Sequence, residues 1–401
     1  MHNAHDHYEG NEAPTKDEPR RALLVYAADS YVGFCQILYD YLILTGTDVS
    51  VLEVLDARNS TVLTESQREK WGVNIPQDII TRVKSDELIE RVEASDADHI
   101  FLGVNGRTVF RICKFLHQQK KADRKPVIIT GFPGLQFRLM VEGVILRCFV
   151  DRLLFTDPTL MKKSAFFLSF LPFKTAQCIL FGSPRLQALP ADRESRGRPY
   201  VVFFDQNVVP REYDVRVRLA EHILALAKDF PDKTFLIAGR SRSGEMSYHP
   251  LAGDTSMDAL VAGQNYRNVS PFSGNWTDIH ADIHLCFSVS STAILEAASL
   301  GIPAYSIAVE GDIDTRFSAQ GFYSRLGLQR TPAELAQEIR EPRPDVPTNA
   351  AKKHIAPFTK SSLPLLFAPK KVERLPEAPV SVRNVLFRLS KFGDWILSKI
   401  R

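Results

Sequence analysis

The sequence predicts an α/β protein with two Rossmann-like domains that face each other across a cleft, followed by a C-terminal amphipathic helix. Residues 22–55 hold a strand, a helix and a second strand, which is the β-α-β spacing of a parallel sheet. A second series of strands and helices begins at residue 200, after a polar segment that contains prolines. In such domains, ligands bind at the carboxyl ends of the strands that border the cleft.

Short apolar runs and helix-spaced apolar residues predict the elements of the N-terminal half. The run ALLVYAAD predicts the first strand, and Gly46 ends the helix that follows it. Strands are predicted at 22–29, 48–55, 99–104 and 126–131. Helices are predicted at 30–46, 108–121 and 135–147. The apolar stretch 164–181 predicts a helix and a strand near the domain junction, although Pro172 and Lys174 interrupt it.

The C-terminal half repeats this alternation of strands and helices. Strands are predicted at 200–206, 233–239, 284–289 and 302–309. Helices are predicted at 213–230 and 290–301. Strands that alternate with helices indicate a mostly parallel sheet with helices on both faces.

Composition divides the 401 residues into five expected segments. They are a disordered head at 1–20, an N-terminal Rossmann-like domain at 21–190, a C-terminal one at 191–340, a Pro-rich extended segment at 341–381 and a basic amphipathic helix at 382–401. The last segment places seven apolar residues on one helical face, with five basic residues mostly elsewhere. Such a helix either packs back onto the first domain or lies on an anionic membrane surface.

Charge and missing motifs exclude several classes of protein. Fifty Lys and Arg residues against 47 Asp and Glu residues exclude a chain-wide polybasic nucleic-acid binder. No apolar stretch is long enough for a transmembrane helix, and the polar N-terminus predicts no signal peptide. Five cysteines without a CxxC pair are typical of reduced thiols in a cytoplasmic protein. The absence of GxxxxGK[ST], HExxH and an early GxGxxG predicts no P-loop, no metal site and no NAD cofactor.

Three hydroxyl residues form the most specific chemical signal in the chain. Ser290, Ser291 and Thr292 come directly after a predicted strand, where a helix is predicted to begin. Hydroxyls and backbone N–H groups at such a junction favour phosphate binding, although Ser and Thr also cap helices for purely local reasons. Glu296 follows within the same segment, where it either reaches a ribose diol or occupies a solvated helix position.

The string SSTAILEAASLGIP at 290–303 resembles the nucleotide-binding segment of GT-B-type glycosyltransferases, in particular the bacterial transferases that use CMP-activated nonulosonic acids. In that family a Ser/Thr run holds the CMP phosphate, and a His-Pro motif assists departure of the leaving group. The resemblance assigns the second role to His249, which precedes Pro250. Nine residues separate His249 from the preceding strand, and Arg240 supplies positive charge among them. TGFPGL at 130–135, followed by Arg147 and Asp151, resembles actinobacterial-type glycosyltransferases.

The resemblance implies a metal-independent glycosyltransferase without a cofactor. Its donor would be a CMP-activated acidic sugar, sialic-acid-like or Kdo-like, and its acceptor a surface glycan or glycolipid, with no nucleic-acid partner. A lipid-linked acceptor would favour contact between residues 382–401 and the inner face of the membrane. Two alternatives stay open. One is a UDP- or GDP-sugar transferase or a nucleotide-sugar epimerase of the same fold, and the other is a non-catalytic nucleotide-sugar-binding protein.

A transferase also needs a base for the acceptor hydroxyl. Asp29 ends the first strand and is the candidate base, with helix capping as the alternative. Asn105 and Arg107 in the strand-end loop VNGRT are candidates for acceptor binding. Gly131 and Gly134 in TGFPGL would let the backbone approach a ligand closely, although a plain turn explains them equally well.

Two further carboxylates are candidates for the base. Asp205 ends the first strand of the C-terminal half, and Glu142 lies on an otherwise apolar helix. The paired acids that the family uses as a base are not present in clear form, so the base is the least defined part of the predicted site.

Overall fold

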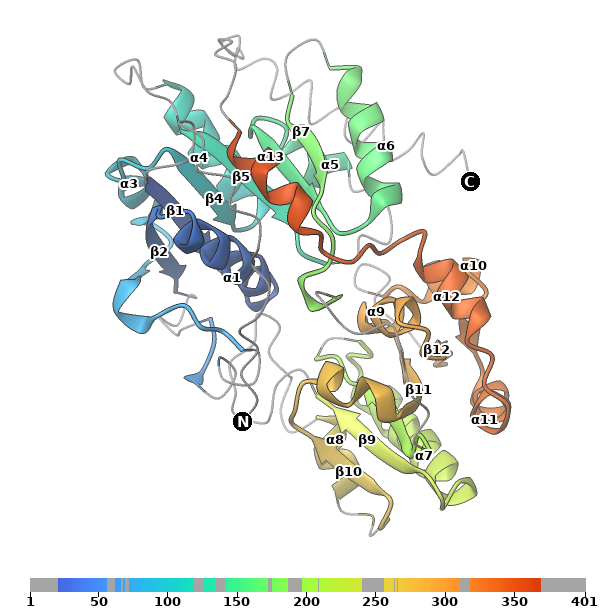
Figure 1. Cartoon of the computed structure of the whole chain (residues 1–401). Coiled ribbons are helices and arrows are strands. Elements are labelled where there is room, and N and C mark those ends of the chain that lie inside the picture. The colour runs from blue at the N-terminus through green and yellow to red at the C-terminus, as the bar shows by residue number, and fades with distance from the viewer. Residues whose placement is uncertain are drawn as a thin grey trace.

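The protein has two parallel-stranded α/β domains, each built around its own sheet (Figure 1). The computed structural model describes residues 21–55, 62–65, 68, 72–118, 126–134, 141–171, 175–186, 197–207, 209–239, 256–262, 264, 266–310 and 318–368. The last strand of the first sheet ends at Leu180, and the first strand of the second sheet begins at Tyr200. The predicted fold class is thereby confirmed, whereas the predicted helix at 382–401 and the predicted head at 1–20 lie outside the described residues.

The N-terminal domain contains a seven-stranded sheet in the order β3-β2-β1-β4-β5-β6-β7. Its strands are β1 (Arg21–Tyr26), β2 (Asp48–Val54), β3 (Ile80–Val83), β4 (His99–Gly103), β5 (Val127–Phe132), β6 (Arg152–Phe155) and β7 (Gln177–Leu180). Its helices are α1 (Asp29–Leu44), η1 (Gln77–Ile79), α3 (Leu88–Glu93), α4 (Gly106–Gln118), α5 (Val141–Ile145), α6 (Pro158–Ser169) and η2 (Pro184–Leu186). The chain order reverses between the neighbours β1 and β4, which makes a topological switch point there.

The C-terminal domain contains a six-stranded sheet in the order β10-β9-β8-β11-β12-β13. Its strands are β8 (Tyr200–Phe204), β9 (Thr234–Ala238), β10 (Val269–Phe272), β11 (Ile283–Ser288), β12 (Ala304–Ile307) and β13 (Gln329–Arg330). Its helices are α7 (Tyr213–Asp229), α8 (Met257–Ala262), η3 (Trp276–Asp282), α9 (Ala293–Ser299), α10 (Gln320–Arg325), α11 (Pro332–Arg340) and α12 (Asp345–Ala351). Here the switch point lies between β8 and β11.

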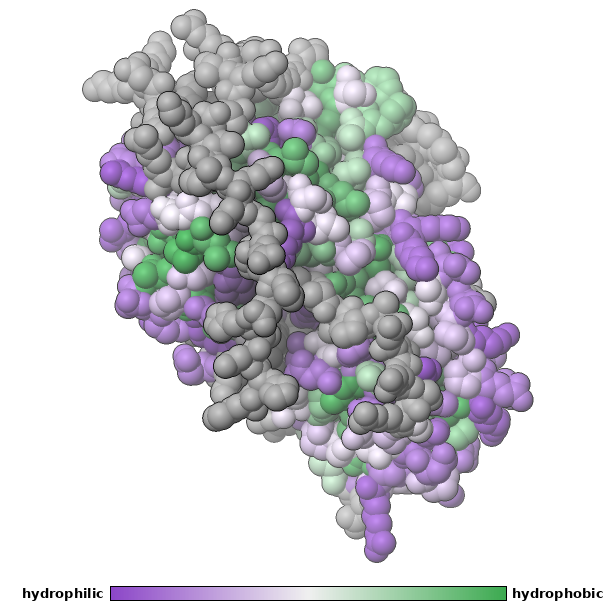
Figure 2. Space-filling view, in the orientation of Figure 1, coloured by the Kyte–Doolittle hydropathy of each residue, from purple (hydrophilic) through white to green (hydrophobic). Residues whose placement is uncertain are grey.

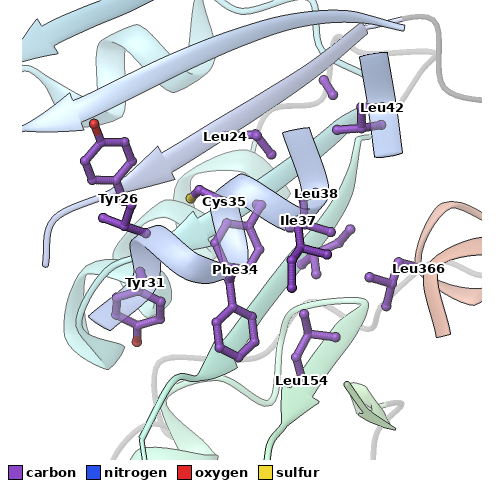
Figure 3. Packing of buried hydrophobic residues seen from close by; sticks show 14 of the residues in the cluster. Leu24, Tyr26, Tyr31, Phe34, Cys35, Ile37, Leu38, Leu42, Leu154 and Leu366 are labelled. Carbon is purple, nitrogen blue, oxygen red and sulfur yellow. The ribbon is translucent and has the colours of Figure 1, made fainter. Parts of the chain in front are cut away.

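Hydrophobic side chains fill both faces of each sheet, which is why the central strands are nearly continuous apolar runs. On one face of the first sheet, α1 packs Phe34 and Leu38 close to Leu154 (Figure 3). Gly131 lies inside β5 rather than in a loop, and a Cβ there would come within 2.9 Å of the Leu154 Cβ. Gly131 therefore serves close strand packing, which corrects its placement in a ligand-binding loop.

The chain returns to the N-terminal domain after α12. The returning segment comprises residues 352–368 and contains η4 (Lys360–Ser362) and α13 (Leu363–Phe367). Pro357 bridges to Ser183, and Phe367 stacks on Tyr41 in the core beneath α1. The Pro-rich stretch was expected to be extended and irregular. Over the described residues 341–368 that expectation is wrong, because the segment is partly helical and buries apolar side chains against the first domain.

The polar faces of the outer helices point away from the domains. Figure 2 shows hydrophilic side chains over the outer edge of the C-terminal domain, where Figure 1 places α11 and α12. In α11, Leu335, Ala336, Glu338 and Ile339 are buried, whereas Glu334, Gln337 and Arg340 are exposed. No helix among the described residues combines the length and the apolar character that crossing a membrane requires.

Short strands and several helices escaped the sequence prediction. The strands that it missed are β3, β6, β10 and β13, each four residues long or shorter. A strand of that length shows too few alternating positions for a periodic signal. The predicted helix 135–147 is described only from Val141 onward, where α5 spans five residues.

His99 links the returning segment to the stability of the fold, and we predict a pH effect from it. The imidazole is buried at the start of β4, 5.2 Å from the Phe367 ring, and burial lowers its pKa to about 4. The unfolded chain, with an ordinary histidine pKa of about 6.5, binds this proton more readily. The contribution of neutral His99 to the free energy of unfolding is therefore fully present above about pH 6.5. It is lost as the pH falls toward 4, which lowers the free energy of unfolding by up to about 3 kcal/mol.

The measurement is the unfolding free energy between pH 4 and 7 for the wild type and for His99→Leu. We expect a flatter pH profile in His99→Leu, because the apolar side chain has no proton to gain. His222→Leu changes an exposed histidine of α7 and should keep the wild-type profile. Parallel profiles for the wild type and His99→Leu would contradict this role of His99.

Candidate functional site

The two switch points place the candidate site residues at the carboxyl ends of the central strands. In the C-terminal domain, the Ser288 hydroxyl at the end of β11 donates to the Phe204 carbonyl at the end of β8, at 2.7 Å. This bond ties the two strands together where an open α/β sheet binds its ligand. The three hydroxyl residues follow immediately in the chain.

The hydroxyl residues at 290–292 do not have equivalent surroundings. The Ser290 hydroxyl is buried and accepts a hydrogen bond from the Ala319 backbone N–H, so it fixes a neighbouring segment. The Ser291 hydroxyl accepts from the Ala293 N–H at 3.2 Å and is half-buried. Thr292 is the N-cap residue of α9, half-buried, and its side chain makes no capping bond. Ser291 and Thr292 are thus the members of the run that are open to a ligand.

A buried tyrosine holds this junction in place. The Tyr323 hydroxyl donates to the Ser291 carbonyl at 2.7 Å. Burial raises the pKa of Tyr323, with a further contribution from the Glu296 charge, so the phenol stays protonated and keeps donating.

Glu296 lies in the first turn of α9 and is buried, which rules out the alternative of a solvated helix position. Its Oε1 accepts from the Ser183 hydroxyl at 3.2 Å, and its Oε2 lies 3.7 Å from the Arg185 guanidinium. Ser183 and Arg185 follow β7, so Glu296 joins the two domains. Its Oε2 receives no hydrogen bond from the described residues and keeps acceptor capacity.

Asp205 is a structural residue, which corrects its candidacy as a base. Both carboxylate oxygens accept from the buried Arg216, at 2.8 and 2.7 Å. The backbone N–H groups of Gln206 and Met257 donate to the same carboxylate. These four hydrogen bonds occupy both carboxylate oxygens, and they fix the connections that follow β8.

Asp29 does not end the first strand as predicted, because β1 ends at Tyr26 and Asp29 is the first residue of α1, just beyond the carboxyl end of β1. The N-cap of this helix is Ala28, so Asp29 is not the capping residue. Its Oδ1 accepts from the Ser30 N–H at 2.7 Å, and the side chain is buried at the switch point of the first sheet.

The other residues of this edge have local partners. The Asn105 side chain accepts from the Thr108 N–H at 3.0 Å and thereby caps α4. Arg107 is exposed and lies 3.9 Å from Glu142, which makes a weak surface pair. Among the described residues, a Cβ at Gly134 would meet nothing within 4 Å, so none of them imposes a packing constraint that requires glycine there.

Arg147 is the residue that sequence reasoning missed as a site residue, although it was noted in the resemblance. Its guanidinium is buried at the same edge, 3.3 Å from the Tyr31 hydroxyl and 4.6 Å from the Phe132 ring centre. The available signal was an arginine that ends the apolar stretch VEGVILR. A charge in such a stretch is rarely buried without a reason.

The remaining predicted residues are not placed. Arg240 and His249 lie outside the described residues, so their roles remain predictions. Among the residues that the structure does describe, no three His, Cys, Asp or Glu side chains group as metal ligands would.

The matching family model decides the relationship. Residues 22–345 match the family described as "Putative glycosyltransferase (DUF6716)". The chain belongs to this family. The match spans both domains and includes all described residues of the candidate site. No curated protein matches the sequence.

Several solved structures share the GT-B fold with this protein, although their sequence identity to it is low. S. aureus MnaA, solved with UDP, superposes with a TM-score of 0.57 at 9% identity, covering 86% of this chain and 94% of its own. Arabidopsis thaliana UGT89C1, complexed with UDP-L-rhamnose, gives 0.51 at 12% identity, covering 84% and 92%. Acinetobacter baumannii MurG gives 0.50 at 11% identity, covering 87% and 98%. At these identities the likeness concerns the fold.

Proposed function

We propose that this protein transfers a sugar from a nucleotide-sugar donor, held by the C-terminal domain, to an acceptor held by the N-terminal domain. The observation that carries the proposal is the hydroxyl pair Ser291 and Thr292 at the switch point of the second sheet, in a chain of a glycosyltransferase family. Asp29 at the switch point of the first sheet is the proposed base. Glu296, at the domain junction, is the proposed partner of the ribose.

The proposed donor is a UDP-sugar. Its support is that two neighbours of this fold were solved with UDP or UDP-L-rhamnose. The sequence resemblance had favoured a CMP-linked acidic sugar, with His249 assisting the leaving group, and that donor is the competing arm of the test. The proposed acceptor is a surface glycan or glycolipid, and the proposed contact of residues 382–401 with a membrane depends on a lipid-linked acceptor.

The donor is tested by thermal unfolding with UDP, CMP, GDP and ADP. A nucleotide that binds only the folded state at 100 times its Kd adds about 2.7 kcal/mol of stability. We expect the largest increase in melting temperature with UDP. A larger increase with CMP would restore the CMP-linked donor, and no increase with any nucleotide would remove the proposed function.

The phosphate-binding role is tested by the double variant Ser291→Ala/Thr292→Val. Loss of hydrogen bonds to a charged phosphate should weaken UDP binding by at least about 10–100-fold, because even one such bond contributes about 1.5–3 kcal/mol. Ser299→Ala removes a hydroxyl from the other end of α9, where it donates to the Glu296 carbonyl, and should bind UDP as the wild type does.

Acceptor dependence separates the transferase from the epimerase alternative. Two neighbours of the same fold are UDP-GlcNAc 2-epimerases from Neisseria meningitidis and Methanocaldococcus jannaschii. A transferase releases UDP at a rate that depends on acceptor, whereas an epimerase converts the donor sugar without one.

A further inference from the structure

Arg147 is a buried cation whose described partners are all neutral. Its terminal nitrogens donate to the Gly143 carbonyl at 3.2 Å, to the Tyr31 hydroxyl at 3.3 Å and to the Val104 carbonyl at 3.5 Å. Its Nε is buried and has no hydrogen-bond partner among the described residues. The residue is 7% exposed. Buried charges are normally paired, because removing a charge from water is unfavourable without a counter-charge.

The location of Arg147 further raises the free-energy cost of burying its charge without a counter-charge. A Cβ on Gly106, the first residue of α4, would lie 2.6 Å from the Arg147 NH1 atom. The guanidinium therefore lies against the N-terminus of a 13-residue helix, which carries partial positive charge. No acidic residue occupies the first turn of α4. The positive charge of Arg147 and the partial positive charge of the α4 N-terminus thus lie side by side in a buried position.

Two neighbouring residues, Gly106 and Phe132, hold the Arg147 guanidinium in this position. Glycine at position 106 leaves the space that the guanidinium fills, since any side chain there would displace it. Phe132 lies under the guanidinium at 4.6 Å and fixes its plane. The point lies after β4 and β5, at the carboxyl edge of the first sheet and on the same edge as Asp29.

We propose that Arg147 and the N-terminus of α4 bind an oxyanion, a phosphate or a carboxylate, carried by the acceptor. The anion supplies the counter-charge that the described residues lack and accepts from the unpartnered Nε. Naming the anion as part of the acceptor rests on the proposed function, whereas the anion site itself does not. The substrate class that follows is an acidic acceptor, either a sugar phosphate or a uronate-type sugar.

The test measures binding of phenyl phosphate, benzoate and neutral benzyl alcohol by calorimetry, with saturating UDP present to fill the nucleotide site. We expect phenyl phosphate or benzoate to bind the wild type, and benzyl alcohol not to bind. Preference between the two anions distinguishes a phosphorylated from a carboxylated acceptor. In Arg147→Met the dissociation constant of the preferred anion should rise at least 10-fold.

Matched variants keep the test decisive. Arg111→Met removes an exposed cation from the same helix, α4, and should change anion binding less than twofold. Arg147→Lys keeps the charge but loses the planar fork, so we expect an intermediate affinity and a folded protein. Equal anion binding by the wild type and Arg147→Met, or no anion binding by the wild type, would overturn the proposal.

The UDP titration of the same proteins separates this proposal from the proposed function. Arg147→Met should bind UDP as the wild type does, because Arg147 belongs to the other domain. If the wild type binds anions through Arg147 but binds no nucleotide, the anion site stands and the transferase proposal fails. If UDP binds and the anions do not, the transferase proposal stands and the anion site fails.

Discussion

Substituting Arg216 by methionine is expected to lower the free energy of unfolding by about 3–5 kcal/mol, because it leaves the Asp205 carboxylate buried without its partner. Arg216 is almost completely buried and donates twice to Asp205 and once to the Gln206 carbonyl at 2.9 Å. These bonds hold the turn between β8 and α7 at the switch point of the second sheet. The measurement is denaturant unfolding at pH 7.

The pH dependence of this loss has a defined sign. Burial already raises the pKa of Asp205 above its ordinary value, and Arg216 opposes that shift. Without Arg216 the carboxyl gains a proton on folding, so the folded variant is disfavoured as the pH rises above the ordinary aspartate pKa. The deficit relative to the wild type should therefore be smaller in acid than at neutral pH.

Two further variants test whether the pair or its burial matters. Asp205→Asn/Arg216→Met removes both charges and should recover part of the lost stability. Arg218→Met alters an exposed arginine of the same helix and should stay within about 0.5 kcal/mol of the wild type. A loss in Arg218→Met as large as in Arg216→Met would show that the effect comes from the helix and not from the buried pair.

Replacing Asp29 by asparagine is expected to reduce acceptor-dependent release of UDP by about 10²–10⁴-fold, the usual contribution of a positioned general base. Asparagine still offers an oxygen to the Ser30 N–H, so the start of α1 keeps its local hydrogen bond. The charge and the proton-accepting capacity are lost. UDP binding and the melting temperature should stay near those of the wild type.

The matched control for Asp29 is Asp40→Asn, an exposed aspartate on the same helix that accepts from the Gln36 amide. It should retain full activity. If Asp29→Asn also retains it, the base lies elsewhere in the chain. A loss of activity that follows a loss of melting temperature would instead make Asp29 a structural residue.

The central strands and the two-domain plan could be predicted from the sequence for a local reason. A parallel strand covered by helices on both faces must be apolar at nearly every position, and β4, β5 and β8 are such runs. The junction of β11 with the hydroxyl run is also local, because strand, turn and helix follow directly in the chain.

Tertiary structure decided which of the predicted polar residues are available for chemistry. Asp205 and Arg216 are 11 residues apart, Ser290 and Ala319 are 29 apart, and Ser183 and Glu296 are 113 apart. No local pattern indicates that Asp205 is neutralised, that the Ser290 hydroxyl is engaged or that Glu296 joins the domains. Arg147 likewise became a candidate only when folding placed it against Gly106, 41 residues earlier in the chain. Hydrophobic burial is set by each residue and its neighbours in sequence, whereas the neutralisation of a charge depends on whichever group folding brings within a few ångströms of it.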